Sequence, residues 1–260
     1  MDYNLIKYPR TQHLQGSRLQ PGDEDLSQIP FSCIFGKHIV IEEKVDGANT
    51  AISFDGEGNL LLQSRGHYLD GGYRERHYNL MKQWAFTYQD LFYSVLGSRY
   101  IMYGEWLYAK HTVFYDALPD YFMEFDVYDR VREVFLDTKE RRILTDKMGI
   151  ISSVPVLAEG IFKSKEEILS FLGVSNFITE NHIEVLKTAS EKLNLDVERQ
   201  LRETDPSVTM EGLYIKVEED GIVKERMKYV RNTFYQCANE SKSHWQTRPI
   251  VPNQLKKEDR

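Results

Sequence analysis

The lysine at position 44 is the residue best placed to do chemistry, because it stands between a short apolar run and a glycine turn in the stretch EKVDGAN, residues 43–49. Residues 39–41 and 51–54 are mostly β-branched or aromatic, so we expect two short strands with Lys44 at the edge of a sheet. A lysine attacks an electrophile only as the neutral amine, which forms near neutral pH where burial or a neighbouring cation lowers the pKa. The alternative is a solvated lysine beside a turn.

Glu105 and Arg65 are two further charged residues in unusual positions. Glu105 interrupts residues 100–107, which are otherwise almost entirely apolar and are expected to form a strand buried on both faces. A carboxylate in such a strand is costly unless a cation or a ligand pairs with it. Arg65 follows an expected strand at 60–63 and precedes a glycine, and a guanidinium fork beside an open backbone suits a phosphate contact.

A hairpin is expected further along the chain, with strands at 211–217 and 222–230 joined by a turn of acidic residues and glycine. Lys224, Arg226 and Lys228 fall on one face of the second strand and form a local positive stripe. On an exposed edge strand such cations commonly serve only to prevent aggregation. Both a positive groove and a protected edge fit this pattern.

Strands and one long helix are expected to position these residues. A turn-rich stretch at 55–59 predicts a hairpin, and residues 121–129 alternate in polarity as a strand does. Residues 73–96 carry apolar side chains at helical spacing, and we expect that stripe to face the core rather than to stack on bases. The stripe consists of Leu80, Trp84, Tyr88, Leu91 and Val95.

Changes in composition along the chain predict its domain organisation. We expect one domain at 1–234, with an N-terminal loop at 1–38 and a helical insertion at about 138–206 that contains a capping-box sequence. Residues 235–260 are expected to form a short charged tail, frayed at its end, with no separate C-terminal domain.

Composition narrows the classes of function. A net charge of −7 over 260 residues argues against a chain that is basic overall, so nucleic acid would have to bind in a local groove of Lys and Arg. Cys33 and Cys237 have neither the spacing of a disulfide framework nor that of a zinc site, which suits a reducing, cytoplasmic setting. We find no signal-peptide core and no apolar run of roughly 20 residues, so no membrane role is expected.

Five stretches, taken in order, resemble the five sequential motifs of the covalent nucleotidyltransferases, the superfamily of ATP-dependent RNA and DNA ligases and mRNA capping enzymes. They are KVDGAN at 44–49, YGEW at 103–106, FMEFDV at 122–127, EGLYIK at 211–216 and RMK at 226–228. Over about residues 8–234 the chain is most similar to RNA ligases of the phage T4 RNA ligase 2 type. Asn49 favours these enzymes, since DNA ligases and capping enzymes usually carry Arg there.

The resemblance implies an α+β nucleotidyltransferase fold, ATP-grasp-like, in which antiparallel sheets flanked by helices enclose an ATP pocket. It also implies an ATP-dependent RNA ligase of RNA repair. Lys44 would attack the α-phosphorus of ATP to form lysyl-AMP, the AMP would pass to an RNA 5′-phosphate, and an RNA 3′-hydroxyl would then displace the AMP. All three steps displace at phosphorus, so catalysis is mostly positioning and neutralisation of charge.

The same resemblance implies roles for individual residues. Lys228 would contact the α-phosphate and lower the pKa of Lys44 by like-charge proximity. Glu211 would be the catalytic carboxylate that engages Mg²⁺ or Mn²⁺. Asn49 would contact the 3′-terminal nucleotide of the RNA. The residues implied at the nucleotide are Glu43 and Phe125 at adenine, Glu105 at the ribose hydroxyls, and Arg65, Arg226 and Lys216 at the phosphates, with an ordinary strand lysine as the alternative for Lys216.

Two features depart from the family pattern. Arg226 stands where the family usually has Lys, which changes the geometry of any triphosphate contact. The phage-type enzymes carry a C-terminal helical domain for which the tail is too short, so RNA ends would be bound by the catalytic domain, the insertion or a partner. The alternative functions are a capping-type guanylyltransferase or minimal DNA ligase, and a non-catalytic nucleotide-binding or RNA-binding module.

Overall fold

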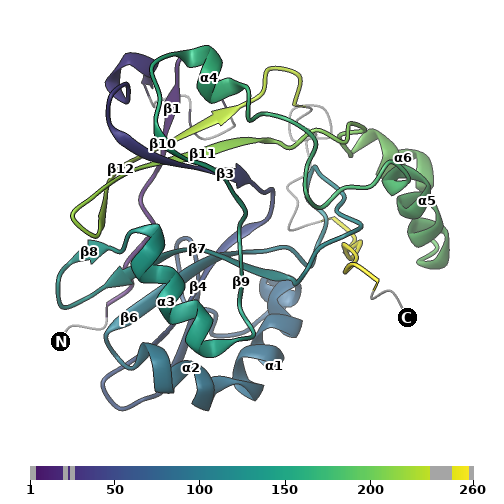
Figure 1. Cartoon of the computed structure of the whole chain (residues 1–260). Coiled ribbons are helices and arrows are strands. Elements are labelled where there is room, and N and C mark those ends of the chain that lie inside the picture. Colours follow the sequence, from purple (N-terminus) through teal and green to yellow (C-terminus); the bar gives the residue numbers. More distant parts are fainter. Residues whose placement is uncertain (1–3, 20–22, 24–26, 235–247, 258–260) are drawn as a thin grey trace.

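The computed structural model describes residues 4–19, 23, 27–234 and 248–257. These residues form two sheets, one above the other, with helices packed around them (Figure 1). In order across it, the upper sheet contains β10 (Val156–Ile161), β3 (His38–Lys44), β11 (Gly212–Glu219), β12 (Ile222–Val230), β1 (Gln12–Leu14) and β2 (Gln28–Ile29). The lower sheet contains β5 (Leu60–Ser64), β4 (Ala48–Phe54), β6 (Tyr100–Trp106), β7 (Phe122–Asp129) and β8 (Val134–Phe135), with β9 (Ser152–Ser153) also paired to β7.

Both sheets are mainly antiparallel, and the expected α+β fold class is confirmed. The parallel pairs are those of β1 with β12 and β2, and of β9 with β7. The helices are the short 3-10 helices η1 (Phe31–Cys33) and η2 (Tyr73–Tyr78), followed by α1 (Asn79–Thr87), α2 (Gln89–Leu96), α3 (Thr138–Met148), α4 (Lys165–Leu169), α5 (His182–Lys192) and α6 (Val197–Arg202). None of the helices among the described residues has the length and apolar character needed to cross a membrane.

Helices α1 and α2 cover the outer face of the lower sheet (Figure 1). The sequence predicted one helix with a single stripe, but the chain bends at Tyr88 and forms two. The predicted stripe faces the core only in part, because Trp84 and Val95 pack against it whereas Leu80 and Tyr88 are exposed. The residues that are buried instead are Met81, Ala85, Phe92 and Leu96. Both stripes have helical spacing, and the packing against the sheet selects between them.

Strand pairing brings the predicted motifs together. In the upper sheet Lys44 lies opposite Gly212, and Lys228 lies opposite Tyr214. Gly212 is required there, because a Cβ would stand 1.9 Å from the carbonyl oxygen of Tyr229. In the lower sheet Asn49 lies opposite Glu105. The loop between β3 and β4 crosses from one sheet to the other, so it joins these two groups of residues at one point.

The segment 138–206, expected as a helical insertion, has a mixed character. It contains α3, α4, α5 and α6, but it also contributes β10, an edge strand of the upper sheet that pairs with β3. Asp137 caps the N-terminus of α3 by accepting a hydrogen bond from the amide of Glu140 at 2.7 Å. The insertion therefore contributes an edge strand to the upper sheet, and two of its helices, α5 and α6, lie together at one end of the molecule (Figure 1).

Part of the tail expected to be frayed is packed against the rest of the chain. Residues 248–257, which we call the C-terminal strap, run beside residues 107–121 and form β-bridges at Pro252 and Leu255. Arg248, Val251 and Asn253 are buried. Cys237 and the remainder of the predicted tail lie outside the described residues.

Candidate active site

A cavity of about 560 Å³ opens between the two sheets. Its volume lies within the roughly 300–1,000 Å³ that is typical of small-molecule sites. Strands from both sheets and the loop after β3 contribute to its wall. The lining residues are Tyr8, Arg10, Thr11, Asp23, Glu42 to Asn49, Ser64 to His67, Tyr78, Glu105, Phe125, Val154, Tyr214 and Lys228.

Lys44 lines this cavity and forms an ion pair with Glu211, which is buried behind Lys44 and is not itself a lining residue. The Nζ atom of Lys44 donates to Oε2 of Glu211 at 2.6 Å, and the Glu211 side chain is fully buried. Glu211 directly precedes Gly212, the strand partner of Lys44, so the pairing of β3 with β11 places the two side chains together. The predicted nucleophile and the predicted catalytic carboxylate are therefore in direct contact.

The charge of Lys44 differs from the expectation. Burial lowers the pKa of Lys44, but Glu211, Asp46 and Glu105 outweigh burial and raise it above its ordinary value. The expected net lowering of the Lys44 pKa is wrong for this arrangement, because these carboxylates outweigh the like charge of Lys228 as well as burial. Burial and Lys44 instead lower the pKa of Lys228. Lys44 must therefore lose a proton before it can attack an electrophile.

Glu105 is the residue that most directly indicates a ligand. Its Oε2 atom is buried and has no hydrogen-bond partner among the described residues. Burial raises the pKa of Glu105 to about 8, although Lys44 opposes the shift. An unpaired buried carboxyl oxygen on the wall of a cavity is costly unless something else hydrogen-bonds to it. A bound molecule with hydroxyl groups would satisfy that atom.

Lys228 of β12 also lines the cavity and has a partner that the sequence did not predict. Its Nζ atom donates to the carboxylate of Asp23, which also accepts from Nε2 of His13 at 3.2 Å. His13 in turn contacts the hydroxyl of Ser17 at 2.7 Å. The N-terminal segment, expected to be a loop, therefore supplies β1 and the acid that holds this lysine.

Asn49, Arg65 and Phe125 also line the cavity, as predicted. Arg65 is exposed at its rim. The Phe125 ring packs edge-on against Tyr8, with their centroids 5.1 Å apart, and leans on Tyr214 at 6.5 Å. The wall around Phe125 is therefore aromatic and suits the flat face of a base.

The contacts of the Glu43 side chain differ from the role at adenine that the resemblance implied. It accepts hydrogen bonds from the hydroxyl of Ser175 and from the backbone and side-chain amides of Asn176, at 3.1 and 2.7 Å. Glu43 therefore fastens β3 to the insertion. Glu42 is two residues from Lys44, hence on the same face of the strand, and its carboxylate contacts the buried cations Arg141 and Lys216.

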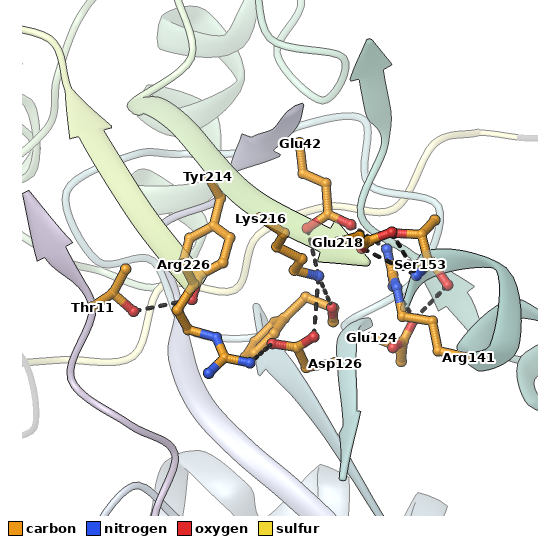
Figure 2. Close-up of polar contacts among 12 residues, drawn as sticks. Thr11, Glu42, Glu124, Asp126, Arg141, Ser153, Tyr214, Lys216, Glu218 and Arg226 are labelled. Carbon is orange, nitrogen blue, oxygen red and sulfur yellow. Dashed lines mark hydrogen bonds and ion pairs between the residues drawn. The ribbon is translucent and has the colours of Figure 1, made fainter. Parts of the chain in front are cut away.

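Lys216 and Arg226 are not among the residues that line the cavity. Lys216 is fully buried, with Nζ 2.9 Å from Glu42 and 3.2 Å from Asp126, and it also donates to the backbone oxygen of Phe125. Arg226 lies 3.5 Å from Asp126 (Figure 2). These contacts do not place either cation at a phosphate, which differs from the implied roles.

The two cations belong to a buried ionic network between the sheets. Its remaining cation is Arg141 of α3, which donates at 2.6 Å to Glu124 of the lower sheet and also to Glu42 of the upper sheet (Figure 2). Every carboxylate in this network faces at least one cation, as buried charges require. The network ties the two sheets together behind the cavity.

Glu211 is the carboxylate beside Lys44 that would hold a divalent cation, since hard cations such as Mg²⁺ prefer oxygen ligands. Within the described part of the chain, no group of three or more His, Cys, Asp and Glu residues forms a preorganised metal site. Glu211 therefore fits a cation whose coordination is completed by phosphate oxygens, the arrangement common for Mg²⁺.

Comparisons with known proteins give the following matches. A family model described as RNA ligase matches residues 37–230. Among solved structures, a mutant Naegleria gruberi RNA ligase with AMP and Mn shows 17% identity and a TM-score of 0.49, covering 88% of this chain and 57% of that one. An archaeal ATP-dependent RNA ligase shows 17% identity and a TM-score of 0.48, covering 88% of this chain and 49% of that one. The chain spans about half the length of these structures. No curated protein sequence matches it.

Proposed function

Because the chain belongs to the RNA ligase family, we propose that it is an ATP-dependent RNA ligase that joins an RNA 5′-phosphate to a 3′-hydroxyl. The observation that carries the proposal is the contact of Lys44 with Glu211 at 2.6 Å, at the cavity that Lys44 lines together with Glu105 and Lys228. Four residues spread over almost the whole domain meet there, as covalent nucleotidyl transfer requires. The order of the five motifs predicted this family.

In the first step the neutral Lys44 amine attacks the α-phosphorus of ATP. The new N–P bond gives lysyl-AMP, the bond to the leaving pyrophosphate breaks, and the proton lost by Lys44 passes to solvent. Glu211 holds the ammonium form of Lys44 and would also hold Mg²⁺ or Mn²⁺, which when bound would neutralise phosphate charge and compete for this carboxylate. Release of Glu211 from Lys44 lowers the pKa of the amine toward the value that burial alone favours.

The wall of the cavity orients the nucleotide. Phe125 stacks on adenine, the unpaired oxygen of Glu105 accepts from the ribose hydroxyls, and Lys228 contacts the α-phosphate. Lys216 acts through Phe125, whose backbone oxygen it holds, and Arg226 acts through Asp126. Since the reaction has little covalent chemistry for side chains to perform, this positioning is the main contribution of the protein.

The second and third steps use RNA. AMP passes from Lys44 to the RNA 5′-phosphate, and the 3′-hydroxyl then displaces AMP to form the phosphodiester. Asn49 and Arg65 at the cavity rim bind the terminal nucleotide and its phosphate. The same proposal includes a role in RNA repair and a partner that helps to bind RNA ends. It also includes the reducing, cytoplasmic setting that the cysteine content favours.

Incubation with ATP labelled at the α-phosphate and with Mg²⁺ tests the proposal. The wild-type chain should gain covalent label, with ATP preferred over GTP, and Lys44→Ala should gain none. Lys37→Ala is the matched control, because Lys37 pairs with Glu225 on the surface, 40% exposed, outside the cavity. Label that persists in Lys44→Ala, or no label in the wild type, would refute nucleotidyl transfer by Lys44.

Ligation assays then identify the substrate. RNA carrying a 5′-phosphate is offered as a nicked duplex, as a broken stem-loop and as two single strands, with DNA-ended controls. The proposal predicts joining of at least one RNA form and an adenylated RNA intermediate. Joining of DNA ends alone would favour the DNA ligase alternative, and label with GTP alone would favour the guanylyltransferase.

A further inference from the structure

The turn that follows the nucleophile is held by a loop outside the cavity. Asp46 accepts backbone hydrogen bonds at its Oδ2 atom from Thr112 at 2.7 Å and Val113 at 3.0 Å. The hydroxyl of Tyr115 accepts the backbone N–H of Asp46 at 2.7 Å. Residues 107–115 therefore form hydrogen bonds with both the side chain and the backbone of Asp46.

Asn253 of the C-terminal strap fixes this loop at both ends. Its Oδ1 atom accepts from the amide of Tyr115 at 3.0 Å, and its Nδ2 atom donates to the carbonyl oxygen of Leu107 at 2.7 Å. Asn253 is 1% exposed, so water cannot replace either bond. Backbone hydrogen bonds continue the contact, from Lys110 to Val251, Asn253 to Tyr108, Gln254 to Tyr115, Leu118 to Gln254 and Lys256 to Leu118.

The turn at Gly47 packs tightly against the start of the loop formed by residues 107–115. A Cβ atom at Gly47 would stand 2.6 Å from Leu107 Cδ2 and 2.9 Å from the carbonyl oxygen of Trp106. The backbone of the turn therefore lies directly against the start of the loop that Asn253 holds. A shift of Leu107 would be transmitted through Gly47 to Lys44, three residues earlier.

We propose that the C-terminal strap is a working part of the nucleotidyl-transfer site, in which Tyr115 and Asn253 are positioning residues for Lys44. The inference rests on the proposed function. It adds to the site two residues that lie outside the five motifs. Asn253 fixes the loop, the loop fixes Asp46 and Gly47, and the turn fixes the direction of the Lys44 amine. In-line attack needs reacting atoms about 3–3.5 Å apart, and a displacement of 1 Å costs on the order of a hundredfold in rate.

Tyr115→Phe is the sharpest test, since it removes only the hydroxyl that accepts from Asp46. Tyr103→Phe is its matched control: Tyr103 is equally buried, and its hydroxyl donates to the backbone oxygen of Ile6 at 2.7 Å, away from the turn. Asn253→Ala is compared with Gln254→Ala, whose strap contacts come from its backbone. The measured quantities are the single-turnover rate of lysyl-AMP formation, its dependence on ATP concentration, and the melting temperature.

The expected result is a rate of lysyl-AMP formation reduced roughly tenfold to a hundredfold in Tyr115→Phe. Half-saturation by ATP should change less than about twofold, because the nucleotide contacts remain, and Tyr103→Phe should keep the wild-type rate despite a similar loss of melting temperature. Equal rates in Tyr115→Phe and Tyr103→Phe, with the wild type labelled, would overturn the inference alone. A wild-type chain without label would overturn the proposed function and this inference with it. Should Asn253→Ala unfold, Tyr115→Phe decides.

Discussion

Replacing Glu105 by Gln tests whether the cavity holds an uncharged carboxyl group at neutral pH. Burial raises the pKa of Glu105 from its ordinary value of 4.5 to about 8. The folded protein therefore binds this proton more tightly than the unfolded chain does. The resulting stabilisation is fully present below about pH 4.5 and is lost as the pH rises through about 8.

The size of the effect follows from the two pKa values. Each pKa unit corresponds to about 1.4 kcal/mol, so the free energy of unfolding should fall by at most about 5 kcal/mol over this range. Water in the cavity solvates the carboxylate in part and makes the loss smaller. Glu105→Gln removes the titrating group but keeps its shape, so the variant should lack this component of the pH dependence.

Urea unfolding of the wild type and Glu105→Gln at pH values from about 5 to 9 measures the effect. The stability of the Gln variant relative to the wild type should rise with pH, by roughly 2 to 4 kcal/mol over the series. Glu198→Gln, which changes an exposed glutamate on α6, should show a constant difference from the wild type. A Glu105→Gln difference that does not vary with pH would show that the carboxyl group is already charged in the folded protein, and would refute the reasoning.

Three further predictions follow from the same geometry. Glu211→Ala should abolish metal-dependent formation of lysyl-AMP with the circular dichroism spectrum unchanged, and normal labelling would contradict its role. Lys44→Met leaves Glu211 without its cation, so the pKa of Glu211, already raised by burial, should rise further. The melting temperature of the variant should therefore fall as the pH increases from about 5 to 8, and a loss independent of pH would contradict this. Arg141→Met should cost about 3–5 kcal/mol in urea unfolding, because two buried glutamates lose their bridge, whereas the exposed neighbour Arg142→Met should cost little.

The sequence identified the centre of the site because strand periodicity and motif order both carry positional information. Lys44, Glu105 and Glu211 stand in or beside short strands bounded by turns, and strands of one motif set pair with one another. Once the pairing is antiparallel, the residue beside Gly212 must lie near Lys44. The order of the motifs therefore predicted that these residues lie together, but not the strand pairing or the ion pair that brings Lys44 and Glu211 into contact.

The sequence could not show what faces each side of a strand. Lys216 and Arg226 lie on the same face of the upper sheet as Lys228, and periodicity alone allowed a phosphate contact for each. Their face is covered by the lower sheet, whose Asp126 neutralises both. Arg141, the third cation of that network, comes from a helix of the insertion, and no local pattern linked it to the site.

The direction of the pKa shift of Lys44 also could not be predicted from the sequence. A motif that contains both lysines and acids does not say which lies closer to the amine. At 2.6 Å, Glu211 is near enough to stabilise the ammonium form, so the predicted lowering of the pKa was wrong. Similarly, the strap was missed because its contacts come mostly from backbone groups and from one buried asparagine.

Peptide mapping by mass spectrometry after incubation with ATP and Mg²⁺ tests the central claim most directly. The account predicts one AMP per chain, joined to the side-chain nitrogen of Lys44 and released when 5′-phosphorylated RNA is added. AMP on any other residue, or an unmodified Lys44 in a folded chain given both ATP and Mg²⁺, would contradict it.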